Sequence, residues 1–366
     1  MAKFLFVGCD LHEKEMLLLY AADDGDVRRR RFRSERRWRK GLVRWLRYEA
    51  ERVGAREVVF AYEASSAGFI LYDDLVAAGV KCHVVAPTKL DRSPHHRHRK
   101  SDANDARVIL DVLRAAYLAG AQLPGVWVPD GMTREAREVV RGRLRTGQKV
   151  AATKNEITSL LKRFGVERPR GVGRPWTKSF RQWVEGLVDC QGPLGPWVGA
   201  TLGSLLSQLK MLEAEIEHFD SLIKALSHTE RYEATSQALD EVKGVGLLAA
   251  MTFLVELGDL ARFSNRRQVA SYLGLVPSCY ESGEADDRKG HITRQGPGRV
   301  RGVLSQAAWA WVRWDERAKR KYDRLVARNP KKRKIALVAM MRQLAVVLWR
   351  RGLEAQRRAA ARSKNT

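Results

Sequence analysis

Two aspartates three residues apart, Asp102 and Asp105, stand where a basic segment runs into an apolar one. The residues after them recur at helical spacing, and Ser101 is a residue type that caps helix N-termini, so we expect a helix to begin here. On a helix this spacing places both carboxylates on one face within one turn. Two ionised carboxylates on one face repel each other unless a cation lies between them; arginine could do so, but a divalent metal is the sharper candidate. The pair therefore predicts metal-assisted chemistry.

Two further acids, Asp10 and Glu63, each follow a run of apolar residues that we interpret as a buried strand. Sites in open α/β sheets form at the ends of strands. We therefore expect Asp10, Glu63, Asp102 and Asp105 to converge into one cluster of carboxylates, which could hold two Mg²⁺ ions. The alternative is that these acids are solvated surface residues beside basic neighbours.

The elements that must position these acids form an alternation of short strands and helices. Apolar and β-branched runs predict strands at residues 4–8, 16–21, 57–62 and 82–86, with an arginine-rich strand at 27–33. Helical periodicity covers residues 34–53 and 67–79. The order β-β-β-α-β-α-β-α predicts a mixed α/β sheet that starts with a hairpin and continues through right-handed crossovers.

The remainder of the chain is predicted to be mainly helical. A basic helix at 131–164 is followed by a linker rich in proline, glycine and arginine. Beyond it, apolar positions alternate in three- and four-residue steps. This pattern is typical of a coiled coil, self-associating or intramolecular, and the alternative is a helix packed on its own domain. We therefore divide the chain into domains at 1–130, 131–228 and 229–366. The apolar positions are Leu202, Leu205, Leu209, Leu212, Ile216, Phe219, Ile223 and Leu226.

The composition is strongly basic, with 67 Lys and Arg against 42 Asp and Glu and a formal net charge of +25. Such an excess predicts a polyanionic partner, most simply nucleic acid. Asp10 comes too early for a signal peptide, and the longest apolar run, 335–349, is short and interrupted by Arg342. The four cysteines form no C-x-x-C pair, so structural zinc is not expected. These features predict a cytoplasmic, nucleoid-associated protein with reduced thiols and no membrane span.

Six short motifs in this order resemble those of the DEDD insertion-sequence transposases and Piv-type invertases, a family of RNA-guided serine recombinases. They are G-C-D at 8–10, Y-E-A-S at 62–65, K-S-D-A-N-D-A-R at 100–107, K-G-V-G at 243–246, Y-L-G-L-V-P at 272–277 and E-S-G at 281–283. The resemblance covers nearly the whole chain. One departure is Pro297, which ends the glycine-rich segment after the serine where the family usually has asparagine or histidine.

The resemblance implies an N-terminal RuvC-like domain of RNase H fold and a C-terminal transposase domain. Together with the helical patterns described above, we expect a coiled-coil middle and a mainly α-helical C-terminal domain. Carried over to this sequence, Asp10, Glu63, Asp102 and Asp105 would bind Mg²⁺ or Mn²⁺, and Ser282 would attack DNA and form a phosphoserine link. The resemblance also implies a structured non-coding guide (bridge) RNA that pairs with donor and target double-stranded DNA. Because the acids and Ser282 are far apart in the sequence, we expect them to meet by domain packing or across a homodimer or homotetramer.

Two other functions stay open from the residues alone. In a metal-dependent RuvC-like nuclease or Holliday junction resolvase, a water molecule would attack the phosphate and Ser282 would be structural. A non-catalytic nucleic-acid-binding protein would not need the acids.

Several other residues carry weaker expectations. His95, His96 and His98 stand among basic residues and are expected to contact phosphate or bases rather than a metal. The basic N-terminal domain and the helix at 134–162 are expected to hold structured RNA. Three tryptophans near the C-terminus are expected to pack between helices rather than stack on bases, namely Trp309, Trp311 and Trp314.

Overall fold

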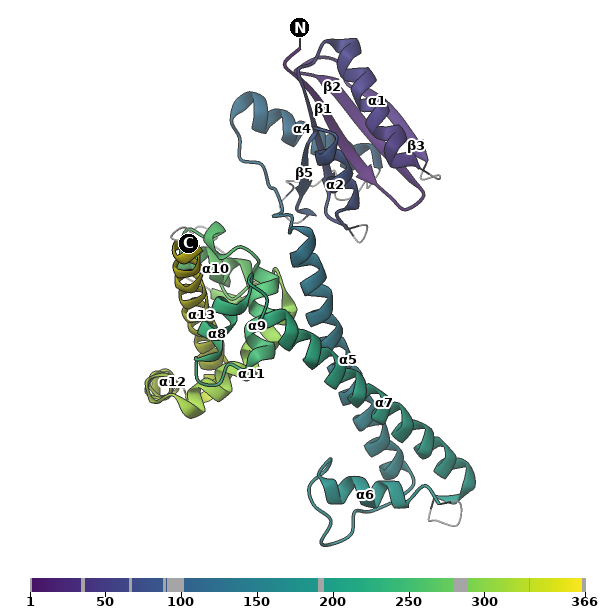
Figure 1. Ribbon diagram of the computed structural model, residues 1–366, viewed down its shortest axis with the longest axis vertical. Helices are drawn as coiled ribbons and strands as arrows, with labels where there is room; N and C mark the ends of the chain where they lie inside the picture. The colour runs from purple at the N-terminus through teal and green to yellow at the C-terminus, as the bar shows by residue number, and fades with distance from the viewer. Residues whose placement is uncertain are drawn as a thin grey trace. The chain divides into compact units, whose positions relative to one another are not determined.

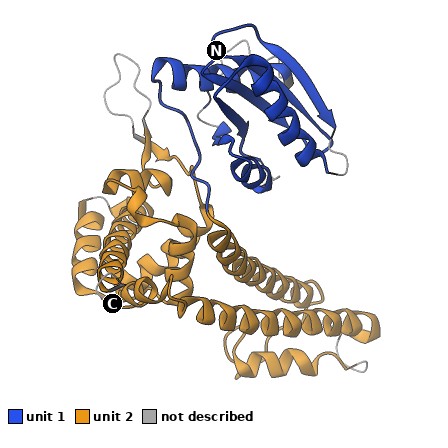
Figure 2. Cartoon of the chain, turned by 45° about the horizontal axis from the view of Figure 1, so that its top comes forward, with its two compact units in different colours: residues 1–129 blue, residues 130–366 orange. Residues whose placement is uncertain are grey.

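The computed structural model describes residues 2–33, 37–65, 68–87, 90, 102–189, 194–279, 289–328 and 330–363, with only the backbone of residues 102, 279, 289 and 363 (Figure 1). The chain splits into two compact units, Met1–Pro129 and Asp130–Thr366, which Figure 2 shows in blue and orange. Each unit has its own hydrophobic clusters. The further division of the second unit at residue 228 stays a prediction.

Unit 1 is built on a five-stranded mixed sheet in the order β3-β2-β1-β4-β5. The first three strands pair antiparallel, whereas β1 with β4 and β4 with β5 pair parallel. This mixed α/β arrangement, with its hairpin start, is compatible with the RNase H-like fold that the resemblance implies. The strands are β1 (Phe4–Leu11), β2 (Glu15–Ala22), β3 (Arg28–Arg33), β4 (Glu57–Glu63) and β5 (Lys81–Val85).

Helices cover both faces of this sheet. Successive residues of a strand point to opposite faces, so the apolar runs of β1 and β4 supply two cores. Leu5 and Val7 pack in one cluster with residues of α1 (Trp38–Val53) and α2 (Ile70–Ala77). Phe4 and Phe6 pack in the other cluster with the buried residues of α4 (Asp102–Ala119). Each face of the strand therefore selects its own helices.

Unit 2 begins with two long helices that pack antiparallel, α5 (Gly131–Arg163) and α7 (Gly195–Ser227), with α6 (Lys178–Gly186) beside them (Figure 1). Ala136 and Val140 of α5 share a cluster with Ile223 near the end of α7. Farther along, Val150 and Ile157 share a cluster with Leu202 and other residues from the start of α7. The heptad residues of α7 thus pack against α5 of the same chain. The self-associating coiled coil stays a prediction.

The rest of unit 2 is a helical assembly around the long helix α13. The buried residues of α8, α9, α11 and α13 belong to one hydrophobic cluster, and α9 is covered along most of its length. None of the described helices is long and apolar enough to cross a membrane. The elements are α8 (Glu233–Asp240), α9 (Leu247–Leu257), η2 (Leu260–Arg262), α10 (Arg266–Tyr272), β6 (Pro277–Cys279), β7 (Lys289–Ile292), α11 (Gly298–Trp314), α12 (Glu316–Arg328), η3 (Pro330–Lys332) and α13 (Arg333–Ser363).

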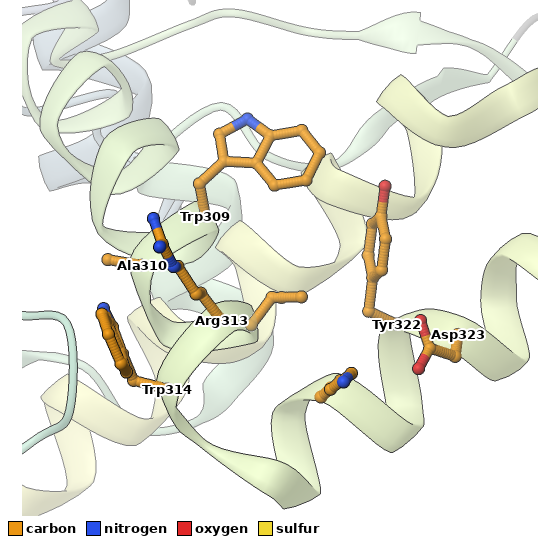
Figure 3. Close-up of a pocket in the computed structure, with 8 residues that line it drawn as sticks. Trp309, Ala310, Arg313, Trp314, Tyr322 and Asp323 are labelled. Carbon is orange, nitrogen blue, oxygen red and sulfur yellow. The ribbon is translucent and has the colours of Figure 1, made fainter.

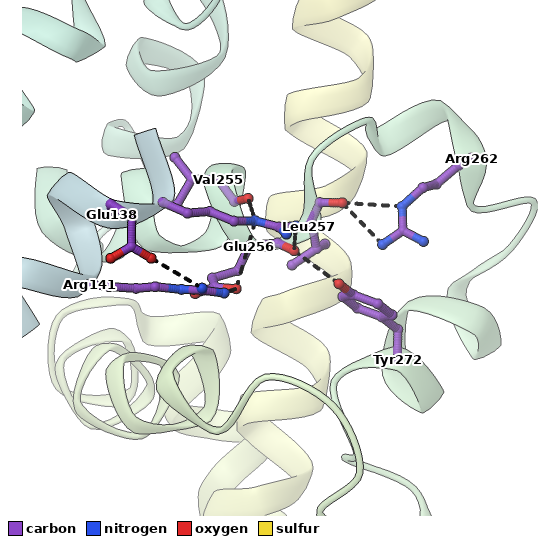
Figure 4. A network of polar contacts seen from close by, with 8 residues as sticks. Glu138, Arg141, Val255, Glu256, Leu257, Arg262 and Tyr272 are labelled. Atoms are coloured by element: carbon purple, nitrogen blue, oxygen red, sulfur yellow. Dashed lines mark hydrogen bonds and ion pairs between the residues drawn. The ribbon is translucent and has the colours of Figure 1, made fainter. Parts of the chain in front are cut away.

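A buried polar network joins α5 to the end of α9 (Figure 4). The Glu256 side chain, 4% exposed, accepts hydrogen bonds from Nε and Nη2 of Arg141 at 2.8 and 2.9 Å. Arg137 donates to the carbonyl oxygens of Val255 and Glu256 at 2.7 and 2.9 Å. The Tyr272 hydroxyl donates to the same Glu256 carbonyl at 3.0 Å. These hydrogen bonds satisfy backbone carbonyl oxygens at the C-terminal end of α9. They also join the α5–α7 pair to the C-terminal helices of unit 2.

This network changes the interpretation of the basic helix α5. Arg137 and Arg141 are committed to α9, and Arg143 donates to the Asp220 carboxylate of α7 at 2.7 and 3.1 Å. Lys154 lies 3.0 Å from Glu213, also on α7. These four basic residues therefore make contacts within unit 2, and RNA binding by this helix stays a prediction.

We predict that Glu256→Ala destabilises unit 2 by about 3–5 kcal/mol, because it leaves the Arg141 guanidinium without its buried partner. Chemical denaturation followed by circular dichroism measures the change. The matched control is Glu354→Ala in α13, whose carboxylate is exposed and pairs with Arg358 one turn away. That variant is expected to stay within about 0.5 kcal/mol of the wild type. Equal effects of the two substitutions would contradict the structural role of the network.

Candidate active site

The acids of unit 1 gather at the ends of its two central strands. Asp10 is the penultimate residue of β1, and Glu63 is the last residue of β4. The parallel pairing of these strands matches Cys9 with Tyr62, so Asp10 and Glu63 are the next residues in each strand. Neighbouring strands lie about 4.8 Å apart, which makes the two acids direct neighbours in the sheet. The prediction that strand ends bring these two acids together agrees with this register.

Both acids also stand on the same face of the sheet. Phe4 and Phe6 of β1 pack against α4, and Asp10 has the same even-numbered phase. On β4 the residues Val59 and Ala61 pack against α4, and Glu63 has their odd-numbered phase. Because side chains alternate along a strand, Asp10 and Glu63 both belong to the face that α4 covers.

A glycine lets α4 lie directly on β1 beside these acids. A Cβ atom at Gly8 would clash with the Ala106 carbonyl oxygen and would lie 2.6 Å from the Leu110 amide nitrogen, both backbone atoms of α4. The glycine of the G-x-D motif is therefore required by the contact between strand and helix. Since Asp105 directly precedes Ala106, this contact brings its turn of the helix against β1, two residues from Asp10.

The structure describes the side chains of three of the four predicted acids. Asp10 is 8% exposed, and Glu63 and Asp105 are partly exposed. Helix α4 begins at Asp102, but the side chain of Asp102 lies outside the described part of the structure. Ser101 lies outside it entirely. Among the described side chains, no group of three His, Cys, Asp or Glu residues could hold a metal ion. The convergence of all four carboxylates on a metal thus stays a prediction, supported by the register and by the contact at Gly8.

A histidine adjoins this site. His12 Nε2 lies 3.1 Å from the Asp10 carboxylate, and its side chain is half exposed. We did not single out this residue from the sequence, although its position two residues after Asp10 was a usable signal, because residues i and i+2 of an extended segment share a face. The thiol of Cys9 lies on the opposite face, where burial and then the Asp10 charge raise its pKa. It is therefore a neutral core residue.

Exposed arginines continue the row of Asp10 across the sheet. Asp10 pairs with Leu17 of β2, and Leu17 pairs with Arg31 of β3. Arg29 and Arg33 have the same phase as Arg31 and are also exposed. Two strand spacings separate this edge from Asp10, a distance of about 10 Å. The face that carries the acids therefore ends in positive charge that suits phosphate groups.

Unit 2 carries the predicted serine between two paired strands. Ser282 and Glu281 lie outside the described residues, as do His95, His96 and His98. On either side of residues 280–288, β6 and β7 pair antiparallel, with Cys279 opposite Lys289. The segment that contains Ser282 thus starts and ends at one place in the fold.

The antiparallel pair β6 and β7, which we call the β6–β7 hairpin, is held at its base by tight backbone contacts. Gly274 and Gly296 have φ angles of 62° and 83°, which favour glycine. A Cβ atom at Gly274 would clash with the backbone of Gln295, and one at Gly296 would clash with the Tyr272 carbonyl oxygen. Arg301 of α11 donates to three backbone carbonyl oxygens at this base, at 3.0–3.3 Å. The Y-L-G-L-V-P motif therefore anchors the hairpin, and Pro297 directly precedes α11.

The K-G-V-G motif has a packing role in this fold. Gly244 has a φ of 84°, and a Cβ atom there would lie 2.5 Å from the backbone nitrogen of Trp311. Glycine is therefore required at position 244, because the backbone of α11 packs directly against it. Gly246 caps the start of α9 and has open space around its Cα atom.

Comparison with known proteins identifies both halves of this arrangement. Residues 7–165 match a family model described as a transposase, the DEDD type of IS110. Residues 236–323 match the "Transposase IS116/IS110/IS902 family". The first match covers the strand ends with Asp10 and Glu63 and the start of α4, and the second covers β6, β7 and the intervening residues, which include Ser282.

Individual relatives match over most of their length. The y4qE protein of Sinorhizobium fredii is 32% identical over 320 residues, which cover 84% of this chain and 75% of the relative. The "Probable family 20 transposase" of Pseudomonas aeruginosa is 29% identical over 79% of this chain and 82% of its own length. The "Transposase for insertion sequence element IS1111A" of Coxiella burnetii is 25% identical over 76% and 73%, respectively.

Proposed function

Because the chain belongs to the DEDD insertion-sequence transposases, and thus acts on DNA, we propose that it cuts and rejoins DNA through Ser282, with divalent metal held by four acids. The acids are Asp10, Glu63, Asp102 and Asp105. The observation that carries the metal assignment is the placement of Asp10 and Glu63 side by side on the face that α4 covers. The Gly8 contact with the turn of Asp105 supports it.

The donor set fits Mg²⁺ or Mn²⁺. All four side chains offer carboxylate oxygens, the ligands that these hard cations prefer, and the nearby Cys9 thiol is neutral and faces the other core. When bound, such a cation orients a phosphate and stabilises the negative charge that develops on it. The protein contributes the rigid strand ends that fix the carboxylates, since these lie on regular elements rather than on loops.

Serine catalysis accounts for cutting and rejoining without another energy source. The Ser282 oxygen forms a bond to phosphorus while the bond from phosphorus to one deoxyribose oxygen breaks. The serine proton is given up, and the leaving oxygen takes up a proton to become a hydroxyl group. Attack by another deoxyribose hydroxyl reverses both changes and releases the serine. The paired strands β6 and β7 and the anchored hairpin base would hold the nucleophile.

We also propose that the protein is guided by a structured RNA and acts as a homodimer or homotetramer. The formal charge of +25 supports a large polyanionic partner. The exposed arginines of β3 offer one surface for a nucleic-acid backbone, which proteins recognise in structured RNA by shape and 2′-hydroxyl contacts. Purification of the protein from its host, followed by sequencing of the bound nucleic acid, tests the RNA assignment; recovery of only random fragments would contradict it.

The serine route predicts a covalent protein–DNA adduct that survives denaturation. We expect the wild type and Ser278→Ala to form it on cognate DNA, and Ser282→Ala to lose it completely, because only the last removes the nucleophile. Ser278 is the matched control, since its hydroxyl donates to the His291 carbonyl oxygen at 3.0 Å within the same hairpin. The measurement is a mobility shift of labelled DNA on a denaturing gel. Cleavage by the wild type without an adduct would instead support a metal-dependent nuclease.

Mixed oligomers address how the acids and Ser282 cooperate. If the sites are shared between subunits, a mixture of Asp102→Ala and Ser282→Ala proteins should recover activity that neither variant has alone. Absence of recovery, with both proteins folded and associated, would favour sites built within one chain.

A further inference from the structure

A cavity of unit 2 lies between α11 and α12 and is lined by aromatic side chains (Figure 3). Its volume is about 620 Å³. Trp309 and Arg313 are four residues apart on α11, and Lys319 and Asp323 are four residues apart on α12, so each helix presents a face to the cavity. The volume is within the range of small-molecule sites and exceeds what one nucleobase needs. We call this cavity the α11–α12 pocket.

The tryptophans of α11 divide into a packing residue and two exposed ones. Trp311 is 7% exposed and belongs to the main core of unit 2, as expected for a helix-packing residue. Trp309 and Trp314 are 49% and 61% exposed and line the α11–α12 pocket. For these two the expectation of simple helix packing is incomplete, because much of each ring faces solvent. Large exposed aromatic groups around a cavity indicate a binding surface.

Two aromatic contacts hold these rings in position. Trp309 packs edge-to-face on Tyr322, with ring centroids 5.7 Å apart. The Arg313 guanidinium lies 5.0 Å from the centroid of Trp314. Rings fixed in this way lose little further freedom when a ligand stacks on them, which favours binding.

Positive charge surrounds the pocket. Arg313 and Lys319 are cations in its lining, against one acid, Asp323. Around the rest of α12 the basic side chains are exposed, and the charge continues into η3. A hydrophobic protein interface is depleted of charge at its core, whereas a groove that combines aromatic rings with cations suits single-stranded nucleic acid. The exposed basic residues of α12 are Arg317, Lys319, Arg320, Lys321, Arg324 and Arg328.

We propose that the α11–α12 pocket binds an unstacked nucleobase of a single-stranded nucleic-acid segment, with the base on Trp309 and neighbouring phosphates on the basic residues of α12. Every base has a π-face, so stacking of this kind tolerates sequence variation. None of the residues that line the pocket is the proposed nucleophile or a proposed metal ligand. The pocket gives the transposase a position that captures a strand once base pairing has been opened.

The test measures affinity of the full-length protein for fluorescein-labelled 12-nucleotide single strands, DNA and RNA of equal sequence, by fluorescence anisotropy. Trp309→Ala is expected to weaken binding about 5- to 150-fold, since stacking of one base contributes about 1–3 kcal/mol. Trp309→Phe should restore most of the affinity, because it keeps an aromatic face. The matched control is Trp197→Ala on α7, a tryptophan that is 85% exposed and outside the pocket. It should change binding by less than about twofold.

Abasic strands separate stacking from charge. Replacement of single nucleotides by abasic sites should weaken binding to the wild type at one or two positions, and these effects should vanish in Trp309→Ala. The salt dependence of Trp309→Ala should match that of the wild type, because no phosphate contact is removed. The ratio of the RNA to the DNA affinity then tells which nucleic acid supplies the base.

Three results would overturn the proposal. One is equal affinity of Trp309→Ala and Trp197→Ala for both strands. Another is a change in sedimentation mass of Trp309→Ala with unchanged strand affinity, which would identify a protein interface instead. The third uses the wild type alone and so does not depend on the folding of a variant: photo-crosslinking of a 5-iodouridine strand should map to Trp309 or Tyr322, and crosslinks only elsewhere would exclude the pocket. None of these experiments measures DNA cleavage. A failure of the proposed serine chemistry would therefore be distinguishable from a failure of base binding in the α11–α12 pocket.

Discussion

Replacement of Asp10 by asparagine is expected to reduce transposition by at least about 10³-fold, the scale of losing a group that stabilises charge at the reacting phosphate. Asparagine has nearly the volume of aspartate and can keep a hydrogen bond to His12. In the wild type, His12 Nε2 lies 3.1 Å from the Asp10 carboxylate. Asparagine lacks the negative charge that a divalent cation requires from its protein ligands. The same loss is expected for Glu63→Gln, since Glu63 is the neighbour of Asp10 in the sheet.

The measurement is excision and insertion of a marked element in cells, paired with titration of the purified protein with Mn²⁺. We expect the wild type to bind Mn²⁺ and Asp10→Asn to bind it more weakly. Asp111→Asn is the matched control, because Asp111 is an exposed acid of α4 that accepts from Arg107 at 3.1 Å. It should leave both readouts unchanged. Full transposition by Asp10→Asn would argue for a non-catalytic role of the acids.

Replacement of Gly8 by alanine is expected to lower the free energy of unfolding of unit 1 by about 1–3 kcal/mol through overpacking. At a position with compatible backbone angles and free space this substitution favours folding, because it reduces the entropy of the unfolded chain. Here the new methyl group would meet backbone atoms of Ala106 and Leu110, which cannot rotate away as a side chain can. Helix α4 must therefore move from β1, and the turn of Asp105 moves with it. Transposition should fall even at temperatures where the variant stays folded.

Chemical denaturation and the transposition assay measure the two effects separately. Gly41→Ala in α1 is the control, because a Cβ atom there meets no other group within 4 Å. It should stabilise the protein by up to about 1 kcal/mol, since alanine is the better helix former. A Gly8→Ala protein with wild-type stability and activity would contradict the contact between α4 and β1.

The sequence by itself determined the local elements and the types of chemical group. The apolar runs before Asp10 and Glu63 identified β1 and β4, and the order of the predicted strands indicated a sheet that starts with a hairpin. Such patterns depend only on which neighbouring residues must face water, so they can be recognised directly in the sequence. The ordered motifs were sufficient to assign the chain to its family, which the comparisons confirm.

Contacts between distant segments were beyond the reach of the sequence pattern. An apolar heptad residue on α7 does not reveal its partner, and the structure shows that α5 of the same chain supplies it. Arg141 belongs to the helix that we expect to hold RNA, and only the structure shows that it donates to the buried Glu256 carboxylate, 115 residues away. Trp309 and Trp311 have the same residue type and similar neighbours, and only the direction of each side chain separates a pocket residue from a core residue.

The acidic site shows both contributions most clearly. The sequence determined that Asp10, Glu63, Asp102 and Asp105 are hard oxygen donors near the ends of regular elements. Only the tertiary structure decided that Asp10 and Glu63 share a face of the sheet, because a shift of one residue in the register would place one of them in the opposite core. Likewise, only the tertiary structure showed why position 8 must be glycine. The backbone of α4 occupies the space that a side chain would need.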